Sequence, residues 1–324
     1  MRIVSRFAPS EPMRGTLSPL VVIGRHAPLW YGDQVHPAFW VASATLLSAT
    51  VFGAPLTQSV SVTVASILFI CGGLPHGAYD IALLRRSGAF GPLGRAMVLA
   101  GYVTIATAMA LLWMTLPLFA LILFLAVAAI HFGEDWQMLD EPLLRFAAGA
   151  AIIAAPTIAH PAEVTQLFVA MSDDRATVVA QFVTAVAPAT LLVTAVGVVI
   201  AWQNEHQRWA AAMILCLTLL MATQPVVAFA LFFVFLHSPR HLMHTRTVLH
   251  DMSRTRWLAT GALLSGAAVV GWLALQFLTL SRIDENLTVQ AFQLLASVAA
   301  PHFLLSRWLE QGLVRTDQRQ EDSA

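Results

Sequence analysis

Residues 226–244 read VVAFALFFVFLHSPRHLMH, an apolar run that ends abruptly in a cluster of histidines. In a helix, residues four apart lie one above the other on the same face, so His237 and His241 can present two imidazoles to one metal ion. Ionisable side chains at the end of an apolar membrane helix are costly to desolvate and are usually functional. This stretch therefore predicts a membrane helix that carries part of a metal site.

The whole chain has the composition of a membrane protein. Of its 324 residues, 58% are hydrophobic and 11% are charged, and the mean hydropathy is +0.72; a soluble domain carries roughly 25% charged residues. All 18 basic residues are Arg, which excludes opsins and enzymes that form a Lys Schiff base. The formal net charge of zero argues against a nucleic-acid partner. Cys71 and Cys216 are isolated in apolar segments, so we expect neither a thiolate site nor a disulfide.

The hydropathy pattern predicts an all-α, polytopic transmembrane helix bundle with about eight to ten spans. We expect residues 1–35 to form a flexible N-terminal extension, residues 36–312 an integral membrane domain, and residues 313–324 a polar C-terminal tail. Most apolar segments approach the roughly 20 residues that cross a bilayer, although 143–159 and 208–223 are short. The apolar segments are 37–55, 58–84, 95–115, 117–133, 143–159, 177–202, 208–223, 225–243, 257–280 and 287–309.

The distribution of Arg predicts the orientation of the chain. With ten crossings and the N-terminus inside, every Arg except Arg175 and Arg282 falls on the inner side. Cytoplasmic loops carry an excess of basic residues, so both termini are expected in the cytoplasm.

Histidines from separate segments fall in one layer of this topology. His76 and His131 lie at the inner ends of their segments, at the same level as the pair His237 and His241. We expect these four side chains to bind one metal ion near the inner face of the membrane. His302, in the last segment, is a further candidate for a ligand position.

Carboxylates follow two of these histidines. Asp80 lies one turn after His76 and could accept the second ring N–H of that imidazole, or pair with Arg85. Glu134 and Asp135 lie three and four residues after His131. We interpret all three as partners that orient the ligands, although Glu134 and Asp135 could equally be ligands themselves or ordinary charges at the membrane surface.

Imidazole donors suit a borderline transition metal such as iron, zinc or copper rather than calcium or magnesium. The spacing alone does not choose among these metals. A non-catalytic carrier would need a pocket but no such metal site.

Three motifs carry a resemblance to a known family. PHGAYD at 75–80, HFGED at 131–135 and HSPRH at 237–241, in this order within a multi-span chain, resemble the Brp/Blh family of bacterial and archaeal β-carotene 15,15'-dioxygenases. Pro301 and His302 also look like a family feature, and the similarity extends from about residue 36 to 310.

The resemblance implies an integral membrane enzyme of the cell inner membrane that splits the central double bond of β-carotene with O2. The products would be two molecules of all-trans-retinal, which suggests a functional link to a retinal-binding rhodopsin. By the resemblance, Fe(II) would be bound by the four motif histidines His76, His131, His237 and His241.

Two other functions stay open on the sequence alone. A membrane diiron hydroxylase or desaturase would need about eight histidines in tight boxes, whereas this chain has one close pair. A non-catalytic carotenoid-binding protein, or an assembly partner of a rhodopsin, would leave the clustering of histidines unexplained.

A slot for a polyene could be lined by large side chains of the 226–244 stretch, namely Phe229, Phe232, Phe233, Phe235 and Met243.

Overall fold

The computed structural model describes residues 35–53, 58–88, 90–279 and 286–321, and this part of the chain contains helices but no strands. The expected N-terminal extension, residues 1–35, lies almost wholly outside the described residues. In chain order the helices are α1 (Pro37–Val51), α2 (Gln58–Gly77), α3 (Asp80–Ser87), α4 (Pro92–Thr115), α5 (Pro117–Gly133), the 3-10 turn η1 (Glu134–Trp136), α6 (Pro142–Ala159), α7 (Pro161–Met171), α8 (Ala176–Gln203), α9 (Gln207–Ala222), α10 (Pro225–Phe232), the π-helical turn η2 (Phe233–His237), α11 (Ser238–Val248), α12 (Arg254–Leu278) and α13 (Leu287–Glu321).

Eight helical segments of the described chain are long and apolar enough to cross a membrane. This confirms the prediction of a polytopic all-α membrane protein. The stretch 37–55 was expected to be a full segment, but its helix ends at Val51. Helices α1 and α9 are apolar but too short to be counted among the membrane spans. Helix α6, expected to be short, does count as a span. The spans are Ser59–Ser87, Pro92–Thr115, Pro117–Trp136, Pro142–Ala159, Ala176–Gln203, Pro225–Val248, Arg254–Leu278 and Leu287–Trp308.

Proline and glycine determine where many of these helices begin and end. Helices α1, α4, α5, α6, α7 and α10 all begin with Pro in the first turn, where its missing N–H costs no hydrogen bond. Gly88 ends α3 in the left-handed conformation, with φ of 64°, which glycine adopts without steric cost. The last helix continues to Glu321, beyond the boundary expected at residue 312.

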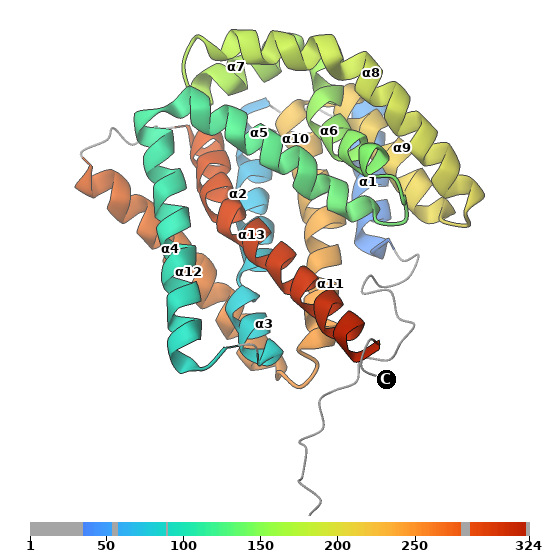
Figure 1. The fold of residues 1–324 in the computed structure, drawn as a ribbon. Helices are drawn as coiled ribbons and strands as arrows, with labels where there is room; N and C mark the ends of the chain where they lie inside the picture. Colours follow the sequence, from blue (N-terminus) through green and yellow to red (C-terminus); the bar gives the residue numbers. More distant parts are fainter. Residues whose placement is uncertain (1–34, 54–57, 89, 280–285, 322–324) are drawn as a thin grey trace, which may run out of the picture.

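Helices α2, α10 and α13 form the centre of the bundle (Figure 1). Helices α4 and α12 lie on one side of this centre, and α6, α8 and α9 lie on the other. Helix α7 and part of α8 cross one end of the bundle. This arrangement places the ends of α2, α5, α10 and α13 around a shared interior.

Helices α5 and α6 pack with unusually close backbones. A Cβ atom added at Gly149 would meet the carbonyl oxygen of Ala129 and the amide nitrogen of Gly133, and one added at Gly133 would lie 2.6 Å from the carbonyl oxygen of Arg145. Small residues permit this approach in membrane helices, where close van der Waals packing drives association. The contact fixes the end of α5, which carries His131.

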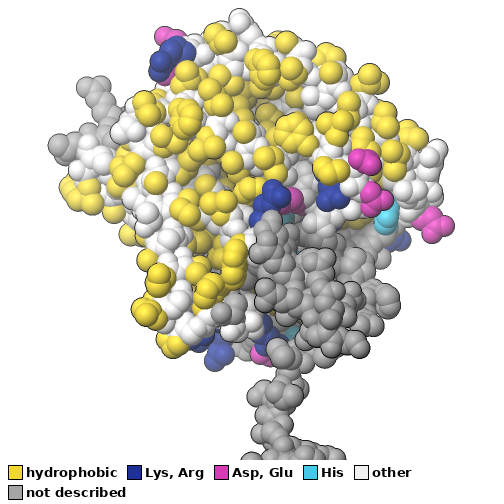
Figure 2. Space-filling view, viewed as in Figure 1, with side chains coloured by type: hydrophobic (Ala, Val, Ile, Leu, Met, Phe, Trp, Pro, Cys, Tyr) yellow, Lys and Arg dark blue, Asp and Glu magenta, His cyan; other side chains and the backbone are white. Residues whose placement is uncertain are grey.

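The outer surface is apolar over a broad area. Figure 2 shows hydrophobic side chains over much of the face that is not drawn in grey, with charged side chains at the edges of this view and in one group near its middle. Exposed large side chains include Phe182 at 66%, Leu192 at 70%, Leu263 at 73% and Phe277 at 77%. Monomeric soluble proteins rarely expose apolar patches of this extent, so this surface faces lipid.

Candidate metal centre

Five histidines from separate helices converge in the interior. They are His76 near the end of α2, His131 near the end of α5, His237 at the end of η2, His241 in the first turn of α11, and His302 in α13. His76, His131, His237 and His302 are between 0% and 7% exposed, and the side chain of His241 is 13% exposed. The structure therefore brings together all four predicted ligands and the additional candidate.

The spacing of these rings fits one metal ion. A ligand nitrogen lies about 2.1 Å from a transition-metal ion, so two imidazoles on one ion have ring centres roughly 4.5 to 6.5 Å apart. The ring centres of His237 and His241 are 4.6 Å apart, and the widest recorded separation in the cluster, between His76 and His131, is 6.4 Å. Ring nitrogens of His76, His131 and His302 lie within 4.8 Å of one another, and the same holds for His131, His237 and His241.

Two buried ring nitrogens of the histidine cluster also fit a metal. Nε2 of His131 and Nε2 of His237 have no hydrogen-bond partner. Leaving a polar atom unsatisfied in an apolar interior costs roughly 1 to 3 kcal/mol. A metal ion bound at these atoms would remove that cost, and an all-imidazole donor set suits iron, zinc or copper.

A local change of helix type positions the close pair. The helix changes type in the π-helical turn Phe233–His237 and continues directly into α11. Pro239 has no backbone N–H to donate to this preceding turn, so it favours the local change of hydrogen bonding. A π-turn inserts one extra residue into the helix and often occurs at functional sites. Here it turns His237 toward the cluster.

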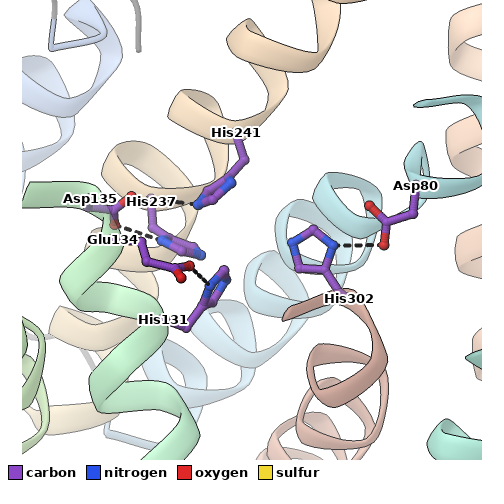
Figure 3. Close-up of polar contacts among 7 residues, drawn as sticks. All are labelled: Asp80, His131, Glu134, Asp135, His237, His241 and His302. Atoms are coloured by element: carbon purple, nitrogen blue, oxygen red, sulfur yellow. Dashed lines mark hydrogen bonds and ion pairs between the residues drawn. The ribbon is translucent and has the colours of Figure 1, made fainter. Parts of the chain in front are cut away.

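Carboxylates hold three of the rings. Nδ1 of His131 lies 3.0 Å from Oε2 of Glu134, and Nδ1 of His237 lies 2.7 Å from Oδ2 of Asp135 (Figure 3). Oδ1 of Asp135 also lies 3.6 Å from Nε2 of His241. An imidazole that donates Nδ1–H to a carboxylate keeps Nε2 as its acceptor atom, which is the form that binds a metal. Asp135 is 1% exposed, so it is not an ordinary surface charge.

The expected partner of Asp80 was wrong. Oδ2 of Asp80 lies 2.8 Å from Nδ1 of His302, whereas Nδ1 of His76 contacts the backbone oxygen of Gly73 in its own helix. Helix α2 ends at Gly77, and the turn at 78–79 directs Asp80 away from His76 and toward α13. Figure 3 shows His302 with one ring nitrogen toward Asp80 and the other toward the remaining histidines.

Arg240 supports the carboxylate side of the cluster. Its guanidinium donates to the backbone oxygen of Asp135 and lies 4.4 Å from the ring centre of Trp209. These contacts fix the turn that carries Asp135.

Three other histidines lie outside the cluster. His36 accepts a hydrogen bond at the start of α1, and Nε2 of His160 lies 3.1 Å from the backbone oxygen of Met221. His250 is exposed. Neither cysteine lies in the cluster, and both are free thiols.

An apolar chamber of about 470 Å³ ends at the histidines. His76, His131 and His302 form its polar end, and its walls come from α2, α4, α5, α10, η2 and α13. Leu123 and Leu304 line the chamber and are also 38% and 53% exposed on the outer surface. The chamber therefore has its rim on the lipid-facing surface. The aromatic side chains in its walls are Phe69, Phe124, Phe132, Phe229, Phe233 and Phe303.

Only some of the expected wall residues line this chamber. Phe229 and Phe233 do, whereas Phe232 is fully buried against the core and Met243 is exposed. Phe235 is partly buried beside the core and is also absent from the chamber wall. The other aromatic wall residues lie on α2, α5 and α13. They could not be predicted from the 226–244 stretch, because they belong to other helices.

Comparison with known proteins identifies the family. A family model described as BCD, Beta-carotene 15,15'-dioxygenase, matches residues 38–310. The chain belongs to this family. It is also 29% identical to the Beta-carotene 15,15'-dioxygenase of uncultured marine bacterium 66A03 over 255 residues, which are 74% of this chain and 90% of that relative. No solved structure matches the chain.

Family membership confirms the predicted class of protein, a carotenoid-cleaving dioxygenase among the oxidoreductases. The match covers the segments that carry all five clustered histidines. A carotenoid-dioxygenase family and a lipid-facing helix bundle agree, because carotenoids are hydrocarbons that dissolve in the bilayer.

Proposed function

We propose that this protein uses iron and O2 to split the central 15,15' double bond of β-carotene. One O2 is consumed, the carbon–carbon double bond breaks, and each half receives one oxygen atom as an aldehyde. The products are two molecules of all-trans-retinal, and no further reductant is needed.

One observation carries this proposal above the others. The apolar chamber opens at the lipid-facing surface and ends at buried imidazoles that are spaced for one ion. A hydrocarbon substrate can reach such a site from the bilayer without crossing water. The chamber wall offers almost only carbon atoms to it, with the three histidines at the closed end.

The ligands that we assign are His76, His131, His237 and His241. Iron bound there would supply the O2 chemistry that side chains cannot perform. The chain itself supplies orientation: Glu134 and Asp135 accept the Nδ1–H protons of two rings and so direct the opposite nitrogens inward. The phenylalanine walls hold the polyene against the histidines and exclude water from them.

Expression in a bacterium that accumulates β-carotene tests the proposal. Cells with the intact protein should lose their orange colour and accumulate retinal, whereas His237→Ala should leave them coloured. His160→Ala is the matched control, because this histidine bonds to a backbone oxygen outside the cluster. Cells that stay coloured with the intact protein, or bleach equally with His237→Ala, would refute the proposed reaction.

Metal analysis separates this reaction from the rival chemistry. A dioxygenase of the proposed kind should contain one iron per chain. Two irons per chain would favour a diiron hydroxylase or desaturase, and bound carotenoid with no metal requirement would favour a carrier.

We also propose the cellular setting. The protein would lie in the inner membrane with both termini in the cytoplasm, as the Arg distribution favours when the short apolar helices α1 and α9 cross the membrane together with the eight longer spans. Residues 36–312 would form the catalytic domain, so removal of residues 1–35 should preserve retinal formation. The retinal would serve a retinal-binding rhodopsin, and C-terminal reporter fusions would test the orientation.

A further inference from the structure

The fifth histidine has the same kind of support as the assigned ligands. His302 is 4% exposed, and its ring centre lies 4.9 Å from that of His76 and 5.6 Å from that of His131. Its Nδ1 lies 2.8 Å from a buried carboxylate oxygen of Asp80. The same pairing occurs at His131 with Glu134 and at His237 with Asp135. Three rings are therefore held by carboxylates from two parts of the chain, the turn η1 and the start of α3.

Asp80 is itself held from a further helix. It is 3% exposed, and Tyr102 of α4 lines the same apolar cavity as Asp80. A buried carboxylate in a membrane is costly unless its oxygens accept hydrogen bonds. The ring N–H of His302 supplies one donor, and the hydroxyl of Tyr102 can supply a second. Tyr102 could not be singled out from the sequence, because its position in an apolar segment resembles that of any interfacial tyrosine.

We propose that His302 is a fifth ligand of the same ion, and that Tyr102 and Asp80 are positioning residues that hold its ring. Donation of Nδ1–H to Asp80 leaves Nε2 as the metal-binding atom. Ring nitrogens of His302, His76 and His131 lie within 4.8 Å of one another, and His131 also belongs to the group with His237 and His241, so this ring joins His302 to the other candidate ligands. This inference rests on the proposed iron site and adds α4 and α13 to the elements that build it.

The affinity for ferrous iron tests this assignment in purified, detergent-solubilised protein, by competition with a chromophoric chelator. His302→Ala should weaken binding at least about 10-fold, and Asp80→Asn about 10-fold, since partners of metal-bound histidines contribute 10- to 100-fold. Tyr102→Phe should weaken it by roughly threefold, because it removes a donor to Asp80 but leaves the contact between Asp80 and His302 in place. Added imidazole should restore much of the affinity of His302→Ala.

Two matched controls separate ligation from folding. Tyr79→Phe removes another buried hydroxyl, which donates to the backbone oxygen of Trp257 and not to the cluster. His160→Ala removes a histidine at the other end of the fold. Both should bind iron as the intact protein does. X-ray absorption of the iron-loaded protein should count one imidazole fewer in His302→Gln.

The possible failures are distinguishable. If His302→Ala and His302→Gln bind iron as tightly as the intact protein, with the same number of imidazoles, His302 is not a ligand, whatever their activity. If the intact protein binds iron through five histidines but forms no retinal, the ligand assignment stands and the proposed reaction falls.

Discussion

Replacement of Asp135 is predicted to weaken the metal site more than any change of a residue outside the histidines. Its carboxylate lies 2.7 Å from Nδ1 of His237 and 3.6 Å from Nε2 of His241, and it is 1% exposed. Asp135→Asn keeps a carbonyl oxygen for His237 but removes the charge, so we expect about 10-fold weaker iron binding. Asp135→Leu removes both the acceptor oxygen and the negative charge beside His237 and His241. We therefore expect iron binding to be about 100-fold weaker, which is about 2.7 kcal/mol in binding free energy.

The assay is a competition titration of ferrous iron against a chelator, in detergent, at fixed pH. Asp140→Asn is the control, because Asp140 is an exposed carboxylate five residues further along the chain and is not part of the cluster. It should bind iron as the intact protein does. Unchanged affinity in Asp135→Leu, with the protein still folded and monodisperse, would refute the claim that this carboxylate orients the ligands.

Three further changes follow from the geometry. Gly149→Ala places a methyl group against the backbone of α5, so it should lower the free energy of unfolding by about 1 to 3 kcal/mol and weaken iron binding. Gly101 has open space around it, so Gly101→Ala should change neither quantity. Thermal unfolding in detergent compares the stability of the two variants. Ala299→Phe fills the apolar chamber and should lower kcat/KM for β-carotene at least about 10-fold without loss of iron, whereas Ala195→Phe on the exposed face of α8 should not. A ferrous chelator should abolish retinal formation, and added Fe(II), but not Zn(II), should restore it; full activity after complete removal of iron would exclude an iron enzyme.

The membrane fold was largely predictable because its signal is local. Twenty apolar residues can satisfy their backbone only as a helix in lipid, so composition and segment length indicate both the class and the approximate spans. The ends of segments were less predictable. The helix expected over 37–55 ends at Val51, and the amphipathic helix α7 was not among the apolar segments at all.

The candidate ligands were predictable because ionisable residues at the ends of apolar segments are conspicuous. Their partners were less so. The pairing of His302 with Asp80 joins residues 222 positions apart, and that of His237 with Asp135 joins residues 102 apart. Such pairings depend on how α3 packs against α13 and η1 against η2, and local spacing alone suggested His76 as the partner of Asp80.

Anomalous diffraction at the iron absorption edge, from crystals of the ferrous protein, tests the central claim most directly. One peak is predicted, within bonding distance of ring nitrogens of His76, His131, His237 and His241. Two separate iron peaks, or a single peak away from these rings, would contradict the account.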